Sequence, residues 1–395
     1  MRVRYSAGKD GKLVKKAIIY TCDEHGINFA DVDSEAVSIV RRLKDMNFDT
    51  YIVGGAVRDL ILGKKPKDFD IVSAASPARI KKIFRNSRII GRRFRLVHVY
   101  FGQRIFEVST FRSLKDGHTS NTFGTIEDDA HRRDFTMNAL YYDPLQQTVA
   151  DYVGGMNDIK KRQVNPIIPL KDIFTDDPVR MIRAVKYAAA ADFSLPFSLQ
   201  LKIKNQSHLL SSISPSRLTE EIFKVINCEK AGVIADLLEK MGLYAYIQPE
   251  AARLMRKNLK FRQCYLQSLG AINRKDDNHG QGLYALFCDY LESTQSWTPG
   301  VIENYRDIFK TARAFLLPMN PPRYNMEHAV RKFLSVRGIS IKRVKAAPGG
   351  DAARTGEAAA ARPAVKRKRR RRRKSAGTQR PQQAAAAGQK TPVTP

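Results

Sequence analysis

The sequence predicts a small α/β head, an all-helical body and a disordered basic tail. Short segments rich in β-branched and aromatic residues alternate with helical patterns up to about residue 155, and helical spacing of apolar residues dominates after it. From Ala346 onward the chain consists mainly of Ala, Gly, Pro, Gln and Arg. The boundary between head and body is expected near residue 165.

The charge of the chain indicates a polyanionic partner. Its 395 residues exceed a typical single domain, and a hydrophobic content of 43% is that of a globular protein. The formal net charge is +30, and the tail from Ala346 contributes 13 Lys/Arg and 2 Asp/Glu, which leaves +19 on the first 345 residues. The folded part is therefore basic by itself.

The cysteines, the histidines and the hydropathy pattern bear on the redox compartment, metal binding and membrane association of the protein. The four cysteines are scattered without a CxxC pair, which favours structural thiols in a reducing compartment and supports neither a zinc site nor a disulfide framework. The seven histidines show no ligand spacing, and no apolar run is long enough to span a bilayer. We therefore expect a soluble, cytoplasmic protein without a membrane partner.

Elements of the head are expected between residues 21 and 165, after a polar and basic N-terminal arm over residues 1–20 that should be mobile. Apolar spacing predicts a helix over residues 33–46, and Ser76-Pro77 is typical of a capped helix start. The predicted strands cover residues 51–53, 95–101 and 104–111. Residues 113–126 have the composition of a loop.

The remainder of the chain is expected to be a helical neck over residues 166–230, a helical body over 231–345 and a tail over 346–395. Helices are predicted over residues 178–190, 216–226 and 231–241, with further helices up to Gly338. The tail contains KRKRRRRRK at 366–374, and such a block of like charges cannot offset the entropy cost of ordering. The block matches a nuclear import signal by pattern, and electrostatic RNA binding is the alternative that we favour.

Two aspartates carry the most specific chemical signal. Asp68 and Asp70 stand two apart in KDFDI, and side chains at i and i+2 of an extended strand project from the same face and can share a divalent metal. The alternative is that they only cap the end of a strand. The preceding Gly54-Gly55 turn opens a helix near Ala56, so backbone N–H groups can approach phosphate oxygens there. Arg58, one turn into that helix, adds a positive charge suited to a triphosphate.

Several motifs recur in order between about Glu24 and Gly338: GGAVRDLILGKKPKDFDI, RRDFTMNALYYDP, DYVGGMNDIKKR and DDPVRMIRAVKYAA. This series resembles the polymerase-beta-type nucleotidyltransferases of the bacterial poly(A) polymerase and tRNA CCA-adding family. The resemblance implies a head of that class and a two-metal nucleotidyl transfer with Mg²⁺ held by Asp68 and Asp70. ATP is the implied substrate and RNA 3′ ends are the implied partner.

A third carboxylate is expected at such a metal site, and the sequence offers two candidates. Glu107 lies on a predicted strand whose parity leaves its direction open. Asp134 follows two arginines in HRRDFTMNA, and the resemblance favours it, with Arg133 contacting the nucleotide. The competing interpretation is that Asp134 is a buried carboxylate paired with Arg132 or Arg133.

The base-reading residues are expected at the start of the helix in FTDDPVRMIRAVKYAAA. Asp177 is the capping candidate, and Arg180 and Arg183 are three apart on one face. A carboxylate accepts from an exocyclic amine and a guanidinium donates to a ring nitrogen, so the pair fits adenine and cytosine and mismatches guanine and uracil. The family has Glu before this pair, whereas Asp176 stands here. The alternative is an ordinary capped helix whose arginines are exposed to solvent and have no role in base recognition.

These residues suit a poly(A) polymerase and a CCA-adding enzyme equally. The stretch RIIGRRFRLVHVYF contains a basic element that resembles the one typical of poly(A) polymerases, although a basic strand edge is the alternative. The stretch LPMNPPRYNMEHAVRKFLSVRGI and the arginine-rich tail also favour the polymerase. The leading hypothesis is a template-independent polynucleotide adenylyltransferase. The alternatives are tRNA CCA addition and a catalytically silent RNA-binding protein.

Overall fold

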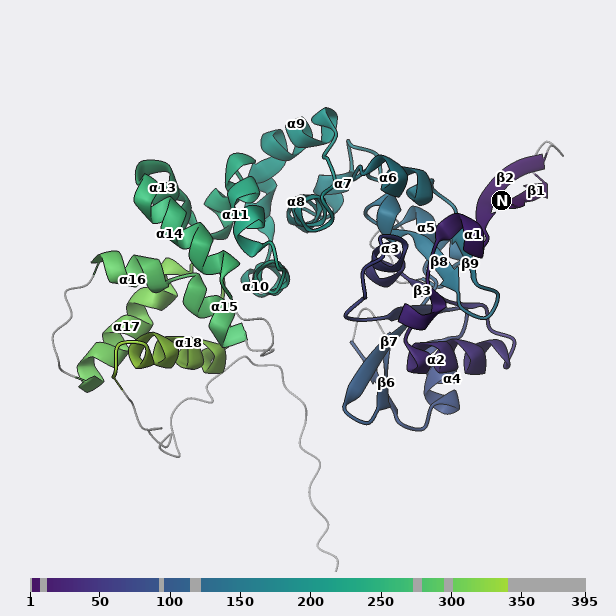
Figure 1. The fold of residues 1–395 in the computed structure, drawn as a ribbon, viewed down its shortest axis with the longest axis horizontal. Helices are drawn as coiled ribbons and strands as arrows, with labels where there is room; N and C mark the ends of the chain where they lie inside the picture. Colours follow the sequence, from purple (N-terminus) through teal and green to yellow (C-terminus); the bar gives the residue numbers. More distant parts are fainter. Residues whose placement is uncertain are drawn as a thin grey trace, which may run out of the picture. The chain divides into compact units, whose positions relative to one another are not determined.

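The computed structural model describes residues 2–7, 13–91, 96–113, 122–272, 279–294 and 301–339. Within these ranges the strands lie between Arg2 and Asp151, in the part coloured purple to blue in Figure 1. From α7 onward, in teal to green, the described elements are helices (Figure 1). The predicted fold class, an α/β head followed by a helical body, is confirmed. The tail lies outside the described residues, as do residues 92–95 of the basic stretch RIIGRRFRLVHVYF.

The head contains a nine-stranded sheet in the order β1-β2-β9-β8-β3-β4-β7-β6-β5. The described pairs are antiparallel except β4 with β7, which is parallel. Seven of these strands are β3 (Thr50–Val53), β4 (Asp70–Ser73), β7 (Arg104–Thr110), β6 (Leu96–Phe101), β5 (Ser87–Ile90), β8 (Leu140–Asp143) and β9 (Thr148–Asp151). The predicted strands over 51–53, 95–101 and 104–111 are confirmed, while β5, β8 and β9 were not predicted.

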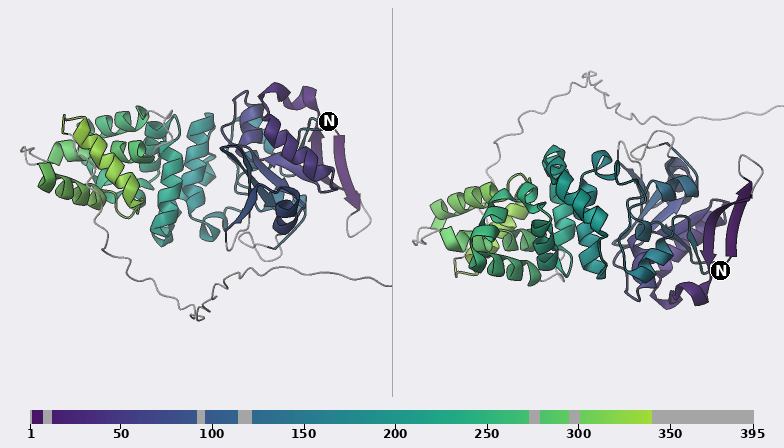
Figure 2. Two further views of the ribbon diagram at one scale, coloured as in Figure 1. Left: turned by 90° about the horizontal axis from the view of Figure 1, so that it is seen from below. Right: turned by 90° about the horizontal axis from the view of Figure 1, so that it is seen from above.

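The N-terminal segment differs from the expected mobile arm. Strands β1 (Arg2–Ala7) and β2 (Leu13–Tyr20) pair antiparallel, and β2 pairs with β9 through Ile18 and Asp151. Figure 2 shows these purple strands beside the N-terminus in both views. The prediction fails because composition alone suggested a polar arm, whereas β2 joins the sheet through β9, which lies more than a hundred residues away in the sequence.

The two faces of the sheet have different partners. One face packs against helices α2 (Ser34–Lys44) and α4 (Pro77–Ile83) and carries most of the apolar core of the head. On the other face a smaller cluster gathers Val53, Val72 and Tyr141 with residues of α5 (Ile126–His131). Asp70 precedes Ile71 and Val72 on β4, so strand alternation places its side chain on this second, less covered face.

Several helices of the head and the neck start where the sequence predicts them. Asp33 caps α2 and Ser76 caps α4, each by accepting a backbone N–H bond. The remaining helices of the head are α1 (Cys22–His25), α3 (Gly55–Ile61) and α6 (Gly155–Lys161). Those of the neck are α7 (Ile173–Asp176), α8 (Val179–Ala191), α9 (Phe197–Gln206) and α10 (Pro215–Ile226). Helices predicted over 178–190 and 216–226 are thus confirmed.

The body continues the helical pattern, and its buried aromatic and aliphatic residues belong to the same apolar cluster as those of the neck and the head. Its described helices are α11 (Ala231–Lys240), α12 (Tyr244–Ile247), α13 (Pro249–Lys257), α14 (Leu259–Gly270), α15 (His279–Ala285), α16 (Cys288–Thr294), α17 (Val301–Phe315) and α18 (Arg323–Ser335). None of the helices in the described ranges is both long and apolar enough to cross a membrane.

Candidate active site

A cavity of about 840 Å³ collects residues from the head and from the start of the neck. Its lining is dominated by arginines and aspartates, and it includes eight of the eleven residues that the sequence predicts: Gly54, Gly55, Asp70, Arg133, Asp134, Asp177, Arg180 and Arg183. A second cavity, of about 770 Å³, is lined by the predicted Asp68 and Arg58. The side chain of Tyr187 lines both cavities. Glu107 lines neither of these two.

The turn between β3 and α3 brings the backbone against the polar groups of the cavity. Gly54 has φ of +80° and ψ of −137°, a conformation open to glycine. A β-carbon at this position would lie 3.7 Å from Asp70 Oδ2 and 3.9 Å from Arg133 Nη1. The peptide groups that open α3 therefore lie directly beside a carboxylate and a guanidinium, an arrangement suited to a phosphate group.

The carboxylates of Asp68, Asp70 and Glu107 lie close together near the start of β4 and the adjacent part of β7. Burial raises the pKa of Asp70 to about 6, with Glu107 and Asp68 raising it further and Arg133 opposing them. The parallel register pairs Ile71 with Val108, so Asp70 and Glu107 immediately precede a matched pair and lie on the same face of neighbouring strands. The strand begins at Asp70 itself, and Asp68 precedes it.

The carboxylates near the start of β4 suit a divalent cation whose remaining ligands come from the substrate and water. Among the described residues, no three of His, Cys, Asp and Glu are arranged to hold a metal ion by themselves. Mg²⁺ is commonly held by one or two carboxylates together with substrate phosphates and water, and it prefers oxygen ligands. Asp68 and Asp70 supply that number of carboxylates, and the pKa of Asp70 is raised by burial and then by the negative charges of Glu107 and Asp68, which a cation would offset. The residues therefore fit the implied metal.

Arg133 is held firmly at the edge of the cavity. Its guanidinium donates to Asp129 Oδ2 at 2.9 Å and 3.2 Å, to the Tyr141 hydroxyl at 3.1 Å and to the carbonyl of Asn138 at 3.3 Å. Although burial lowers it, the pKa of Arg133 is raised overall by Tyr141 and Asp129. The hydroxyl of Tyr141 also donates to Asp129 at 2.8 Å.

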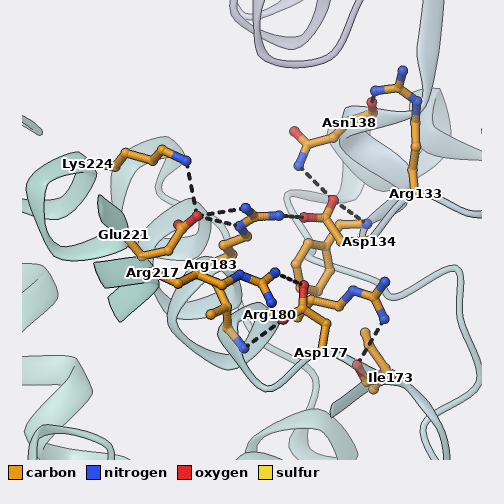
Figure 3. A network of polar contacts seen from close by, with 12 residues as sticks. Arg133, Asp134, Asn138, Ile173, Asp177, Arg180, Arg183, Arg217, Glu221 and Lys224 are labelled. Carbon is orange, nitrogen blue, oxygen red and sulfur yellow. Dashed lines mark hydrogen bonds and ion pairs between the residues drawn. The ribbon is translucent and has the colours of Figure 1, made fainter. Parts of the chain in front are cut away.

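The competing interpretation paired Asp134 with Arg132 or Arg133, but the ion pair that the described residues show for Asp134 is with Arg183. Asp134 Oδ1 accepts from the backbone of Phe135 at 2.8 Å and from Asn138 at 3.4 Å, and its Oδ2 lies 3.8 Å from Arg183 (Figure 3). The parallel register of β4 and β7 places Glu107 beside Asp70, and Glu107 is the leading charged group that raises the pKa of Asp70. Asp134 lines the same cavity as Asp70, whereas Glu107 does not, so the third carboxylate stays a prediction with two candidates.

Two side chains from different parts of the head fix the orientation of Arg58 by accepting hydrogen bonds from it. It donates to Asp59 Oδ1 at 2.7 Å and 2.9 Å and to Asn138 Oδ1 at 2.9 Å. Its guanidinium also lies over the ring of Tyr187, 5.4 Å from the centroid. Asn138 therefore connects Arg58 with Asp134, because its amide oxygen accepts from one and its amide nitrogen donates to the other.

The base-reading candidates lie at the start of α8. Asp177 Oδ1 accepts from the backbone of Val179 at 3.2 Å, but the residue at the N-cap of α8 is Pro178, so the predicted cap lies one residue before the observed one. Arg180 is buried and donates to the carbonyl of Ile173 at 3.0 Å, and burial lowers its pKa against the opposing effect of Asp177 (Figure 3). An arginine has five N–H donors, so further donors of Arg180 remain for a base.

Helix α10 contributes residues that the sequence did not indicate. Arg217 donates to Asp177 Oδ2 at 2.7 Å, and Glu221 accepts from Arg183 at 2.7 Å and 3.2 Å and from Lys224 at 3.0 Å (Figure 3). Burial acts to raise the pKa of Glu221, but the bonds from Arg183 lower it to about 2. Arg217, Glu221 and Lys224 are four and three residues apart, so they lie on one face of α10. The partners Asp177 and Arg183 are about forty residues away in the sequence, so no local pattern could have revealed these contacts.

Family models match two parts of the chain. Residues 50–165 match the model of the poly A polymerase head domain, which contains the glycine turn, the Asp68 and Asp70 pair and Arg133. Residues 192–255 match the model described as the probable RNA and SrmB-binding site of polymerase A. This second range includes Arg217 and Glu221.

Individual relatives cover a similar extent. The chain is 39% identical over 252 residues to poly(A) polymerase I of Salmonella typhi, which is 60% of this chain and 54% of that protein. It is 34% identical over 237 residues to the CCA-adding enzyme of Geobacillus stearothermophilus, which is 58% of each. The chain spans about half the length of the curated relatives it matches.

A solved structure supports the same relationship. The crystal structure of the Bacillus stearothermophilus CCA-adding enzyme in complex with CTP has a TM-score of 0.54 and 25% identity, covering 76% of this chain and 82% of that one. Together with the ordered motifs that converge on one cavity, these similarities show that the chain belongs to the family of bacterial poly(A) polymerases and tRNA nucleotidyltransferases.

Proposed function

We propose that this chain adds AMP from ATP to RNA 3′ ends without a template, in the cytoplasm and with Mg²⁺, as a step that promotes RNA decay. The observation that carries the proposal is the shared cavity: the base-reading pair, Asp177 and Arg180, lines the same space as Asp70 and the Gly54 turn. A nucleotide bound there would have its base read by the neck while its phosphates meet the head.

The polarity of the base-reading pair selects adenine or cytosine. Arg217 and the Val179 amide occupy part of the Asp177 carboxylate, but an ionised carboxylate has about four acceptor sites. Asp177 therefore retains capacity to accept from an exocyclic amine, while Arg180 donates to the adjacent ring nitrogen. Guanine presents a carbonyl and an N–H at these positions, so both contacts would be mismatched.

The head supplies the groups that hold and orient the phosphates. A divalent ion held by Asp68 and Asp70 would supply positive charge for the reacting phosphate and would favour ionisation of an RNA 3′-hydroxyl. Arg133 and the peptide groups after Gly54 lie beside Asp70, so they would fix the phosphate chain against that edge. Arg58 and Asp134, both bonded to Asn138, would align the remainder of the nucleotide.

CCA addition to tRNA is the second candidate, because the same pair suits cytosine and because a CCA-adding enzyme is 34% identical to the chain. The relatives that are poly(A) polymerases are 39–40% identical, and the nine consecutive basic residues of the tail suit an RNA grip that is independent of tRNA shape. These two observations favour adenylate transfer.

The discriminating experiment supplies ATP or CTP separately to the full chain, with either an unstructured RNA or a tRNA that lacks its CCA end. Polyadenylation predicts long products from ATP on the unstructured RNA and little incorporation from CTP. Addition limited to three nucleotides, dependent on CTP and confined to the tRNA, would establish the second candidate instead. RNA binding without incorporation from either nucleotide would indicate a catalytically silent RNA-binding protein.

A further inference from the structure

A row of four side chains crosses the sheet from the edge strand β5 to Asp70. The strand registers pair Arg88 with His98 and His98 with Glu107, and Glu107 lies beside Asp70 on the parallel pair of β7 and β4. Directly opposed residues of neighbouring strands share a face, so the four side chains follow one another across the second face of the sheet. Three strand spacings separate Arg88 from Asp70, which corresponds to roughly 14 Å.

The β5 and β6 part of this face is open. Val97 and Val99 belong to the apolar core on the first face, so the alternating residues His98 and Tyr100 project from the second. Among the described residues, the apolar cluster of the second face contains none from β5 or β6. Ile105, which pairs with Tyr100, is 52% exposed. Aromatic and apolar surface is therefore accessible beside the row.

The surroundings of Tyr100 are basic. Between Asp70 and Glu107 the sequence contains nine Lys/Arg and no Asp/Glu. A cavity of about 550 Å³ at the β5 edge has a lining without carboxylates: Lys81, Arg85, Asn86, Ser87, Arg88, Ile89 and Tyr100. Proteins bind single-stranded nucleic acid with such a combination, because the ring stacks on a base while the cations contact phosphates.

The groups that would hold the triphosphate lie on the opposite side of Asp70. Gly54 follows β3, and Arg133 and Asn138 precede β8. In the sheet order, β3 and β8 lie on one side of β4, whereas β7, β6 and β5 lie on the other. The attacking and leaving oxygens of such a transfer are roughly in line through the reacting phosphorus. An acceptor 3′-hydroxyl would therefore approach from the β7 side.

We propose that Arg88, His98 and Tyr100 form an acceptor platform for the last nucleotides of the RNA strand, an inference that rests on the proposed function for its occupant. Tyr100 stacks on a base and Arg88 contacts a phosphate. The ring of His98 lies edge-on to that of Tyr100, with centroids 6.4 Å apart, and its Nε2 lies 3.4 Å from Glu107 Oε1. The platform is thus continuous with the carboxylates. About four nucleotides span the distance to Asp70 at the ~3.4 Å rise of a stacked strand.

The test is a cycle between protein and RNA variants, measured by equilibrium binding to the full chain without ATP. The probes are an oligoadenylate and versions of it with one abasic nucleotide at each of the last four positions. Tyr100→Ala should weaken binding of the intact probe roughly five- to hundredfold. The loss should be smaller for the probe that lacks the stacked base, because that contact is already absent. Contributions from the rest of the chain, including the basic tail, cancel in the cycle.

A loss of affinity with Tyr100→Ala that is the same for every probe, or no loss at all, would overturn the proposal. Tyr100→Phe keeps the ring and should bind like the wild type, so a loss equal to that of Tyr100→Ala would contradict stacking. Arg88→Gln should reduce the slope of log affinity against log salt by roughly 0.7. Arg79→Gln is the matched control, since Arg79 is exposed on α4, on the first face. Equal slopes for the two arginine variants would contradict the phosphate contact.

Two further measurements separate the platform from a damaged head and from the proposed reaction. Tyr100 and Arg88 do not line the nucleotide cavity, so ATP affinity should stay at the wild-type level, and a parallel loss would contradict the platform. If thermal unfolding shows that Tyr100→Ala does not fold, Tyr100→Leu takes its place in the cycle. Coupling to an abasic position without any incorporation would support the platform and refute adenylate transfer. Incorporation without coupling would overturn the platform alone.

Discussion

Arg217 holds Asp177 through a hydrogen bond of 2.7 Å from its guanidinium to Oδ2, while Oδ1 accepts from the backbone of Val179. The carboxylate is thereby attached to α10 by one oxygen and to the start of α8 by the other. Its orientation depends on the packing of two helices whose sequences are about forty residues apart. Base selection in the proposed reaction is therefore a property of this helix pair.

Replacing Asp177 with Asn should change base selection. The amide that results presents a donor as well as an acceptor, so it can satisfy the carbonyl of guanine that the carboxylate rejects. We expect the preference for ATP over GTP to fall roughly ten- to hundredfold, with a smaller effect on triphosphate binding. Competitive incorporation assays measure the preference. Arg217→Gln should lower it less, because it releases the carboxylate without changing its polarity, and an unchanged preference in Asp177→Asn would show that the base is read elsewhere.

Replacing Asp68 or Asp70 with Ala should abolish nucleotide incorporation and leave RNA binding nearly intact. The expected loss is several orders of magnitude, because the metal that these carboxylates would hold supplies most of the catalysis in nucleotidyl transfer. Single-turnover incorporation and RNA titration provide the two measurements. Asp31→Ala, at an exposed aspartate, is the control. Retention of more than about a tenth of the wild-type rate would mean that the metal site lies elsewhere.

Gly54→Ala should damage the site through the backbone. The conformation at φ of +80° and ψ of −137° is strained for alanine by roughly 1–3 kcal/mol, so we expect the turn to move away from Asp70 and incorporation to fall. Gly26→Ala is the matched control, since Gly26 also has a positive φ, of +66°, and no atom within 4 Å of an added β-carbon. Equal incorporation by the two variants would contradict a role of the turn in holding phosphate.

Glu221→Gln should change the acid dependence of stability. The pKa of Glu221 is lowered from 4.5 to about 2, so its ion pair stabilises the fold above about pH 4.5 and this contribution disappears as the pH falls towards 2. The shift corresponds to roughly 3 kcal/mol. In urea unfolding the variant should be less stable than the wild type at pH 7, with the difference shrinking towards pH 3. Glu250→Gln, in a surface pair with Arg253, should show less than about 1 kcal/mol at any pH.

Deleting the chain after Lys345 should weaken RNA binding and shorten the products, while single-nucleotide addition at saturating RNA persists. The nine consecutive basic residues at 366–374 can neutralise several phosphates, and each contact on single-stranded RNA contributes roughly −0.7 to the slope of log affinity against log salt. RNA titrations between low and moderate salt should give a shallower slope for the truncated protein. Equal slopes would remove RNA binding as the role of the block and revive targeting or protein docking.

The sequence by itself determined the fold class, the order of the motifs and eight of the residues that line the main cavity. These follow from local relations: the glycine turn before a helix, and the spacing of Asp177 and Arg180. Each relation acts over a few residues, where backbone geometry alone fixes which side chains share a face. The strand alternation expected for Asp68 and Asp70 does not apply, because β4 begins at Asp70 and Asp68 lines the second cavity.

The tertiary structure decided which distant residues meet. The parallel register of β4 and β7 places Glu107 beside Asp70, and the packing of α8 on α10 supplies Arg217 and Glu221. Likewise β2 becomes a strand because β9 offers it hydrogen-bond partners. No spacing rule encodes these contacts, because their geometry depends on how two separately predicted elements pack, and that depends on the buried surface of both.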